Sequence, residues 1–250
     1  MNPSIFRERK PGGRKTFDLE AVVLAGGLGT RLKSVLADTP KILAPLGGRP
    51  LLDTFIDKLL EGGAARIILC VGYLRDQIIE YVRRRAQEDG RYRLIEFSKE
   101  QWPLGTGGAL KNAASLVKKK TFFIMNGDTL HEIDIAALRL FHLKTNGAIT
   151  IAVHVSNRED VGRMRVDASA RILGFEEKSA DKNLPVSTGV YMMNKDVLAK
   201  MPSGPFSLEY DFFPTFVQKF PCYAFFSEGD VIDIGTPERY HSAKKRYTQN

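Results

Sequence analysis

The sequence predicts an α/β fold, built as a mostly parallel mixed sheet with helices on both faces. Four apolar runs are typical of buried strands, since strands covered on both faces read as continuous hydrophobic stretches: 21–25, 66–71, 121–125 and 149–155. Four segments with apolar residues at helical spacing lie among them: 51–61, 75–86, 106–117 and 134–144. This alternation favours parallel strand pairing with helical crossovers on either side of one sheet.

The second half of the chain has a more mixed pattern of shorter segments. Short strands are expected at 163–166, 171–175, 186–193 and 222–227. Helices are expected at 209–219 and 236–247, the latter beginning with the favourable helix start Thr236-Pro237-Glu238. The absence of a hexapeptide repeat predicts that no β-helix is appended. The expected organisation is a flexible basic extension over 1–18 and a single domain over 19–250.

Charge and cysteine content narrow the classes of function. The formal net charge is +8, but residues 1–19 carry +3 and residues 239–250 carry +4, which leaves +1 for the remainder. Because the excess lies at the two ends, and no helix-turn-helix or zinc-finger motif is present, we expect no nucleic-acid partner. Cys70 and Cys222 are too isolated for a zinc site or a disulfide framework. No apolar stretch approaches the roughly 20 residues of a membrane span, so the prediction is a cytoplasmic protein with no membrane partner.

The most informative segment is a glycine loop that directly follows the first predicted strand. It reads Gly26-Gly27-Leu28-Gly29-Thr30-Arg31-Leu32, and Pro40-Lys41 follows. Its backbone N–H groups can point at phosphate oxygens, since glycine allows close approach. Arg31 and Lys41 can neutralise the charge that builds up during transfer. The loop matches neither the G-x-G-x-x-G fingerprint nor the P-loop pattern, so it predicts a nucleotide-using enzyme of another kind.

Other candidate motifs lie where the ligand crevice of a parallel sheet is expected, beyond the carboxyl ends of the strands. Gly72-Tyr73 and Asn126-Gly127-Asp128 each follow a predicted strand. Asp128 stands beside a glycine, so its carboxylate can bind Mg²⁺ without crowding. The loop Pro103-Leu104-Gly105-Thr106-Gly107-Gly108 has glycines that permit close backbone approach, and a helix is expected to follow it.

The glycine loop together with Pro40-Lys41 resembles the signature of the sugar-1-phosphate nucleotidylyltransferases. The resemblance implies a Rossmann-like (GT-A-like) fold and an enzyme that makes an NDP-sugar and pyrophosphate from an NTP and a sugar 1-phosphate. The order and spacing of the later motifs extend it from Glu20 to the C-terminus. Within the family, the pattern is most similar to guanylyltransferases that act on D-glycero-α-D-manno-heptose 1-phosphate. The alternatives are mannose-1-phosphate guanylyltransferases and the nucleotidylyltransferases for glucose 1-phosphate or MurNAc 1-phosphate.

The resemblance also implies roles for particular residues. Arg31 and Lys41 are the expected catalytic residues. The expected nucleotide-binding residues are Leu24, Ala25, Gly26, Gly27, Gly29, Thr30, Gly72, Tyr73, Gly105, Thr106 and Gly107. The expected sugar-phosphate-binding residues are Asn126, Glu177, Lys178, Thr188 and Gly189. Asp128 and Asp233 are expected to bind the cofactor Mg²⁺, which requires that they converge in space.

The chain departs from the family pattern at Ile42 and Ser179, which stand where prolines are common. Both are neighbours of functional residues, so they bear on the subgroup more than on the enzyme class. The expected reaction is a single in-line displacement at the α-phosphate.

Two other classes of protein fit the residues less well. A catalytically silent regulatory homologue would be expected to lose Arg31, Lys41, Asp128 or Asp233, and all four are present. A glycosyltransferase would usually carry a DxD motif, and Asn126-Gly127-Asp128 lacks the first acid. The sequence leaves a homo-oligomer open.

Overall fold

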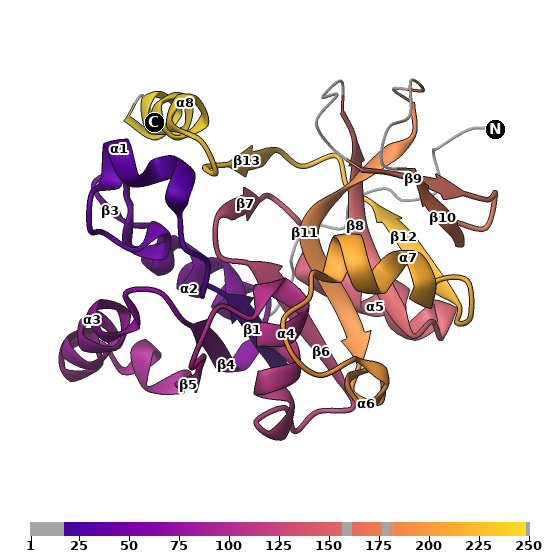
Figure 1. The fold of residues 1–250 in the computed structure, drawn as a ribbon, viewed down its shortest axis with the longest axis horizontal. Coiled ribbons are helices and arrows are strands. Elements are labelled where there is room, and N and C mark those ends of the chain that lie inside the picture. Colours follow the sequence, from indigo (N-terminus) through magenta and orange to yellow (C-terminus); the bar gives the residue numbers. More distant parts are fainter. Residues whose placement is uncertain (1–17, 157–161, 177–180, 182, 249–250) are drawn as a thin grey trace.

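A mixed sheet with a parallel centre organises the protein (Figure 1), and the computed structural model describes residues 18–156, 162–176, 181 and 183–248. The parallel strands are β1 (Leu19–Leu24), β4 (Ala64–Val71), β5 (Ile95–Lys99) and β6 (Thr121–Asn126). β1 lies between β4 and β6, and β5 extends the sheet beyond β4. The carboxyl ends of β1, β4 and β6 therefore meet at one edge, where ligands of such sheets bind.

The second half of the chain continues the sheet with antiparallel pairing. β11 (Pro185–Asn194) pairs antiparallel with β6 and with β8 (Ile149–Val155). β9 (Arg163–Val166) pairs with β11 and with β10 (Ile172–Glu176), and β12 (Cys222–Phe226) lies parallel to β8. The predicted mixed sheet is therefore confirmed.

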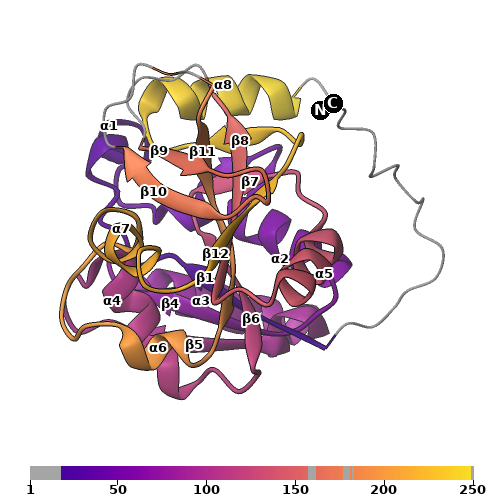
Figure 2. The same ribbon diagram turned by 90° about the vertical axis from the view of Figure 1, so that its right-hand side faces the viewer.

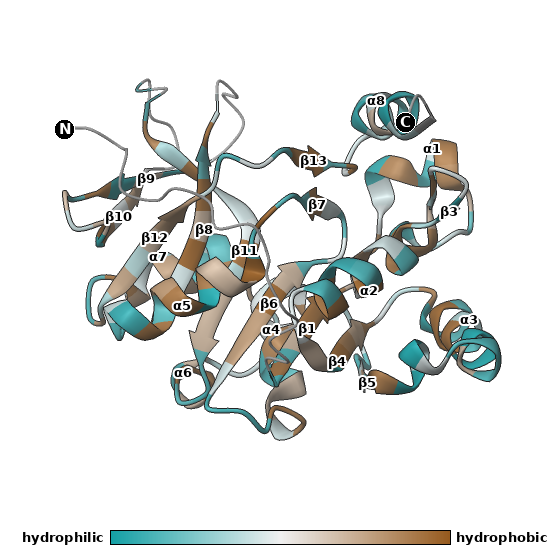
Figure 3. Ribbon diagram, turned by 180° about the vertical axis from the view of Figure 1, so that it is seen from behind, coloured by the Kyte–Doolittle hydropathy of each residue, from teal (hydrophilic) through white to brown (hydrophobic). Residues whose placement is uncertain are grey.

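Helices cover both faces of this sheet (Figure 2). One face carries α2 (Leu51–Glu61), α3 (Arg75–Glu88) and α5 (Ile135–Thr145). α8 (Pro237–Thr248) lies at the top in Figures 1 and 2 and packs Tyr240 and Ala243 into the same core. The other face carries α4 (Gly105–Asn112), α6 (Val197–Lys200) and α7 (Phe213–Phe216). Along β1, Ala21 and Val23 pack into the first layer, whereas Val22 and Leu24 pack into the second, because successive side chains of a strand point to opposite faces. In Figure 3 the strands are accordingly rich in hydrophobic residues and α3 is largely hydrophilic.

Small elements between these segments shape the upper edge of the sheet. α1 (Lys33–Leu36) and the hairpin of β2 (Pro45–Leu46) and β3 (Arg49–Pro50) connect β1 to α2. A two-stranded antiparallel ribbon joins β7 (Thr129–His131) to β13 (Val231–Asp233), with Asp233 opposite Thr129. This ribbon was not predicted, because strands of three residues are too short to show a period. Short 3₁₀ turns lie at Thr30–Leu32, Lys41–Leu43, Gly90–Leu94 and Ala113–Ser115.

Two predicted helices have different forms in the structure. The helix expected at 106–117 is α-helical only to Asn112 and continues as a 3₁₀ turn. The helix expected at 209–219 is a π-helical turn, Leu208–Phe212, followed by the short α7. Pro214 lies in the first turn of α7, where its missing N–H has no intrahelical partner to lose. β5 was not predicted, because its polar residues interrupt the apolar run. Residues 1–17 of the expected extension lie outside the described residues.

Candidate active site

The glycine loop extends from the end of β1 across the edge where the parallel strands meet. Ala25 N donates to Cys70 O at 2.9 Å and Gly127 N donates to Leu24 O at 2.8 Å, which fixes both loops to the neighbouring strands. A Cβ atom on Gly26 would lie 1.9 Å from Glu100 Oε1, so a larger residue there would displace this carboxylate. A Cβ atom on Gly27 would have no neighbour within 4 Å, and this residue lines an open cavity.

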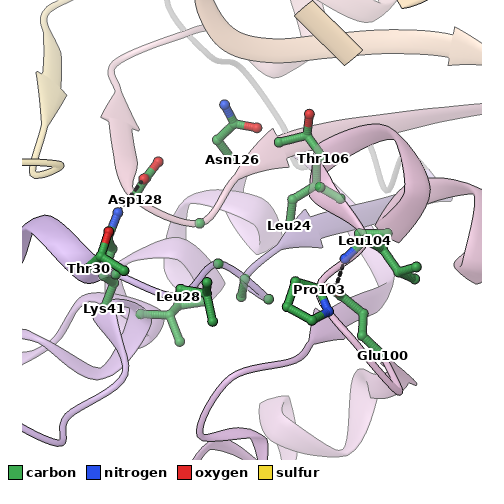
Figure 4. Close-up of a pocket in the computed structure, with 18 of the residues that line it drawn as sticks. Leu24, Leu28, Thr30, Lys41, Glu100, Pro103, Leu104, Thr106, Asn126 and Asp128 are labelled. Atoms are coloured by element: carbon green, nitrogen blue, oxygen red, sulfur yellow. Dashed lines mark hydrogen bonds and ion pairs between the residues drawn. The ribbon is translucent and has the colours of Figure 1, made fainter. Parts of the chain in front are cut away.

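That first cavity has a volume of about 400 Å³ and is lined by three loops (Figure 4). They are the glycine loop, the 103–106 loop and the Asn126–Asp128 turn. Figure 4 shows Thr30, Lys41 and Asp128 at one end, and Pro103, Leu104 and Glu100 at the other. Of the predicted nucleotide-binding residues, the following line it: Leu24, Ala25, Gly26, Gly27, Gly29, Thr30, Gly105 and Thr106.

Three predicted nucleotide-binding residues are placed elsewhere. Within the described chain, Gly72, Tyr73 and Gly107 line neither this cavity nor the second one described below. Tyr73 instead lies beneath the ammonium of Lys33, which is 5.8 Å from the ring centroid. Gly107 packs against the Phe206 ring, 2.0 Å from where a Cβ atom would be. Gly72 lies close to the glycine loop, since a Cβ atom there would be 2.8 Å from Gly26 O.

One end of the first cavity is cationic. Lys41 Nζ lies 3.1 Å from Asp128 Oδ2, and both side chains are half-buried. Arg31 is exposed and lines the cavity, and among the described residues it has no hydrogen-bond or ion-pair partner. This end of the cavity therefore has two cations, and only Lys41 is paired with a carboxylate. Such an arrangement is suited to a polyphosphate, whose negative oxygens both cations can bind.

The opposite end contains Glu100, a residue that the sequence analysis missed. Glu100 is 5% exposed, and its Oε2 accepts a hydrogen bond from Leu104 N at 3.1 Å. Its Oε1 is buried and has no partner among the described residues. Burial raises the pKa of this carboxyl group, and the Leu104 hydrogen bond opposes the shift.

A second cavity, of about 450 Å³, opens beside the first. It shares four lining residues with the first: Arg31, Thr106, Asn126 and Asp128. Thr188 and Gly189, predicted to contact the sugar phosphate, also line it. The Thr188 hydroxyl donates to Ala152 O at 3.0 Å. The predicted Glu177 and Lys178 lie outside the described residues.

Asn126 stands at the junction of the two cavities. A Cβ atom on Gly189 would lie 2.7 Å from Asn126 Nδ2, so the glycine lets this amide pack against β11. Asn126 Oδ1 is buried and has no partner among the described residues. A buried polar atom without a partner is costly, so the junction is suited to a ligand that supplies a donor.

The β7–β13 ribbon brings Asp128 and Asp233 to the second cavity. Ile234 N donates to Asp128 O at 3.1 Å, and both carboxylates line the cavity. Asp233 accepts hydrogen bonds from Gly235 N and from Arg239, each at 2.6 Å. Among the described residues no three His, Cys, Asp or Glu side chains cluster as a complete metal site. Two carboxylates with room beside them nevertheless fit Mg²⁺, which takes few protein ligands and keeps waters and phosphate oxygens.

A glycine loop with cations at one end of a cavity, open to a second polar cavity, defines a site in which a nucleotide reacts with a second substrate. The Nucleotidyl transferase family model matches residues 20–250, and the chain belongs to this family. The predicted enzyme class is therefore confirmed.

The relatives narrow the subgroup that this chain resembles. It is 34% identical to the D-glycero-alpha-D-manno-heptose 1-phosphate guanylyltransferase of Aneurinibacillus thermoaerophilus, over 91% of this chain and 97% of that protein. It is 35% identical to the enzyme of the same name from Campylobacter jejuni, over 89% of this chain and 97% of that protein. The crystal structure of HddC from Yersinia pseudotuberculosis complexed with GMP-PN has a TM-score of 0.77 and 32% identity, covering 92% of this chain and 99% of that chain.

None of the helices in the described ranges is long and apolar enough to cross a membrane.

Proposed function

We propose that this protein transfers GMP from GTP to a sugar 1-phosphate, with D-glycero-α-D-manno-heptose 1-phosphate as the acceptor, giving GDP-heptose and pyrophosphate in the cytoplasm. The observation that carries the proposal is the junction at which the two cavities share Arg31, Thr106, Asn126 and Asp128. A nucleotide in the first cavity and a sugar phosphate in the second would meet there. The names of the relatives support the choice of guanine and of a heptose.

The proposed step is one in-line displacement. An oxygen of the acceptor phosphate forms a bond to the α-phosphorus, and the bond from that phosphorus to the bridging oxygen breaks. The electron pair leaves with pyrophosphate. Arg31 would hold the leaving phosphates, and Lys41 would neutralise charge near the α-phosphate. No side-chain nucleophile is required, so catalysis rests on positioning and charge.

Glu100 supports guanine as the base. An ionised carboxylate only accepts hydrogen bonds, and guanine presents two adjacent donors, N1–H and the N2 amine. A base that donates to this carboxyl would supply the partner that Oε1 lacks. Adenine and cytosine instead pair a donor with an acceptor at the corresponding edge.

We propose Asp128 and Asp233 as the residues that hold Mg²⁺. When bound, this ion would neutralise phosphate charge at the junction. Lys41 and Arg239 now pair with these carboxylates, so each cation would have to release its carboxylate and become available to phosphate oxygens. Lys178, which lies outside the described residues, is proposed to pair with the acceptor phosphate, and Glu177 with sugar hydroxyls.

The proposal is tested by pyrophosphate release from a grid of substrates with Mg²⁺. The grid pairs GTP, ATP, UTP and CTP with the 1-phosphates of heptose, mannose, glucose and MurNAc. We expect release with GTP and the heptose phosphate. Release with a different pair would keep the reaction and correct the substrates, whereas no release across the grid would refute the proposed function.

A further inference from the structure

The 103–108 loop is held by a second segment, residues 204–212, which forms part of the second cavity. Gly107 N donates to Phe206 O at 3.0 Å, and Phe206 N donates to Leu104 O at 2.9 Å. A Cβ atom on Gly105, whose φ is +69°, would lie 2.6 Å from Phe206 O. The loop that lines the nucleotide cavity therefore packs directly on the segment that reaches the second cavity.

The Glu209 side chain links its own segment, residues 204–212, to the 103–108 loop. Its Oε2 accepts hydrogen bonds from Thr106 Oγ1 at 2.9 Å and from Ser207 Oγ at 3.1 Å. Its Oε1 accepts one from Tyr191 OH at 2.7 Å. Tyr191 is fully buried, and burial raises the pKa of its hydroxyl, so this group stays a donor at neutral pH.

Glu209 retains capacity for another donor. An ionised carboxylate offers about four lone-pair positions, and the contacts above occupy three of them. Glu209 is half-buried and lines the second cavity. The remaining position on Oε1 is therefore suited to a hydroxyl of a molecule in that cavity.

Tyr210 adds an aromatic surface to the same cavity. Its side chain is 69% exposed and lines the cavity, and no aromatic or cation contact involves its ring within the described part of the chain. Both residues belong to the π-helical turn Leu208–Phe212, a rare form that is frequent at functional sites. A ring beside a carboxylate matches a sugar, which has C–H groups to pack and hydroxyls to donate.

We propose that Glu209 accepts a hydrogen bond from a hydroxyl of the acceptor sugar, and that the Tyr210 ring packs against that sugar. The two residues then determine which sugar 1-phosphate is accepted. The inference rests on the proposed function and names a part of its acceptor site that the sequence motifs left unassigned.

The test compares Glu209→Gln with Asp211→Asn. Asp211 is a matched control, because it is an exposed carboxylate in the same turn that accepts from Ser207 N at 2.7 Å and does not line the cavity. With heptose 1-phosphate and mannose 1-phosphate as acceptors, we expect Glu209→Gln to raise the acceptor KM about 10-fold or more, since a hydrogen bond to a charged group is weakened. The KM for GTP should stay within about twofold in both variants, and Asp211→Asn should leave the acceptor KM unchanged within the same margin.

Monodeoxy sugar 1-phosphates identify the hydroxyl. Wild type should lose affinity for one analogue by about the factor that Glu209→Gln costs, and the variant should show no further loss with that analogue. Calorimetric binding of the sugar 1-phosphates gives the same comparison without turnover. If Glu209→Gln does not fold, Tyr210→Ala and Tyr210→Phe carry the test, and only the alanine variant should raise the acceptor KM.

The outcomes separate this inference from the proposed function. An unchanged acceptor KM, or an equal rise in the GTP KM, would overturn the role of Glu209 while leaving the enzyme's reaction intact. Absence of turnover and of sugar-phosphate binding in wild type would refute the proposed function itself, and this inference with it.

Discussion

Replacement of Glu100 by Gln tests how the protein would select its base. Gln keeps the size of Glu and an oxygen that can accept from Leu104 N, but it puts an amide donor where Oε1 lies. A guanine that donates to Oε1 would then face a donor. Losing a hydrogen bond to a charged group costs about 1.5–3 kcal/mol, and a buried donor left unpaired adds about 1–3 kcal/mol. A total of about 3 kcal/mol corresponds to a roughly 100-fold rise in the KM for GTP.

The same substitution should have the opposite effect on the stability of the free protein. Burial raises the pKa of Glu100 above its ordinary value of 4.5, so the folded state binds this proton more tightly than the unfolded state. The free energy of unfolding of wild type therefore falls as pH rises through the folded pKa of Glu100. Glu100→Gln removes that loss, and the variant should be at least as stable as wild type at pH 7.

The assay is steady-state pyrophosphate release with GTP and with inosine triphosphate, which keeps N1–H and lacks the N2 amine. Wild type should prefer GTP, and the variant should lose most of that preference. Thermal unfolding of both proteins from pH 4 to pH 8 supplies the stability comparison. A GTP KM within twofold of wild type, together with an unchanged preference over inosine triphosphate, would refute the assignment of Glu100 to the base.

Three further predictions concern the metal carboxylate, the loop packing and the pH dependence of stability. Asp128→Asn should lower kcat by about 100-fold or more and weaken Mn²⁺ binding measured by electron paramagnetic resonance. The unfolding midpoint should change little, because the lost ion pair with Lys41 is partly exposed. Turnover at the wild-type rate would contradict the role of Asp128 in metal binding. Gly107→Ala should destabilise the fold by about 1–3 kcal/mol in urea unfolding, because its Cβ atom would meet the Phe206 ring at 2.0 Å, whereas Gly90→Ala, with no neighbour within 4 Å, should cost little. Burial lowers the pKa of His131 from 6.5 to about 4. The contribution of this residue to the free energy of unfolding is therefore complete above pH 6.5 and is lost as the pH falls toward 4. Unfolding measured against pH should show that His131→Gln removes up to about 3 kcal/mol of this dependence.

The layered sheet was predictable because its signals are local. The run 21–25 is apolar on both faces, and the structure buries Ala21 and Val22 in different cores. The helix 51–61 was predicted with the bounds of α2, since its apolar spacing and the glycines after it are adjacent in sequence. The β7–β13 ribbon escaped prediction, because its stability comes from pairing residues about 100 positions apart.

The residues of the candidate site likewise divide into those with a local signal in the sequence and those that only distant contacts reveal. Arg31 and Lys41 were found in the sequence because their loop follows a buried strand. Glu100 was missed, because a single glutamate after a short strand has no periodic signal, and only its enclosure by Gly26 and Leu104 distinguishes it from a surface acid. Of the loop glycines predicted to bind the nucleotide, Gly105 lines the first cavity, whereas Gly107 packs against Phe206.

The sequence by itself determined the fold class, the family resemblance and the loops in which the chemistry is expected, because strand periodicity and glycine spacing are properties of adjacent residues. The tertiary structure decided which of these residues share a cavity and that Asp128 and Asp233 both line the second one. It also decided that Glu209, which lines the second cavity, accepts a hydrogen bond from Thr106, which lines both. These facts depend on contacts between segments far apart in the chain, and such contacts exist only once the sheet has brought the ends of its strands together.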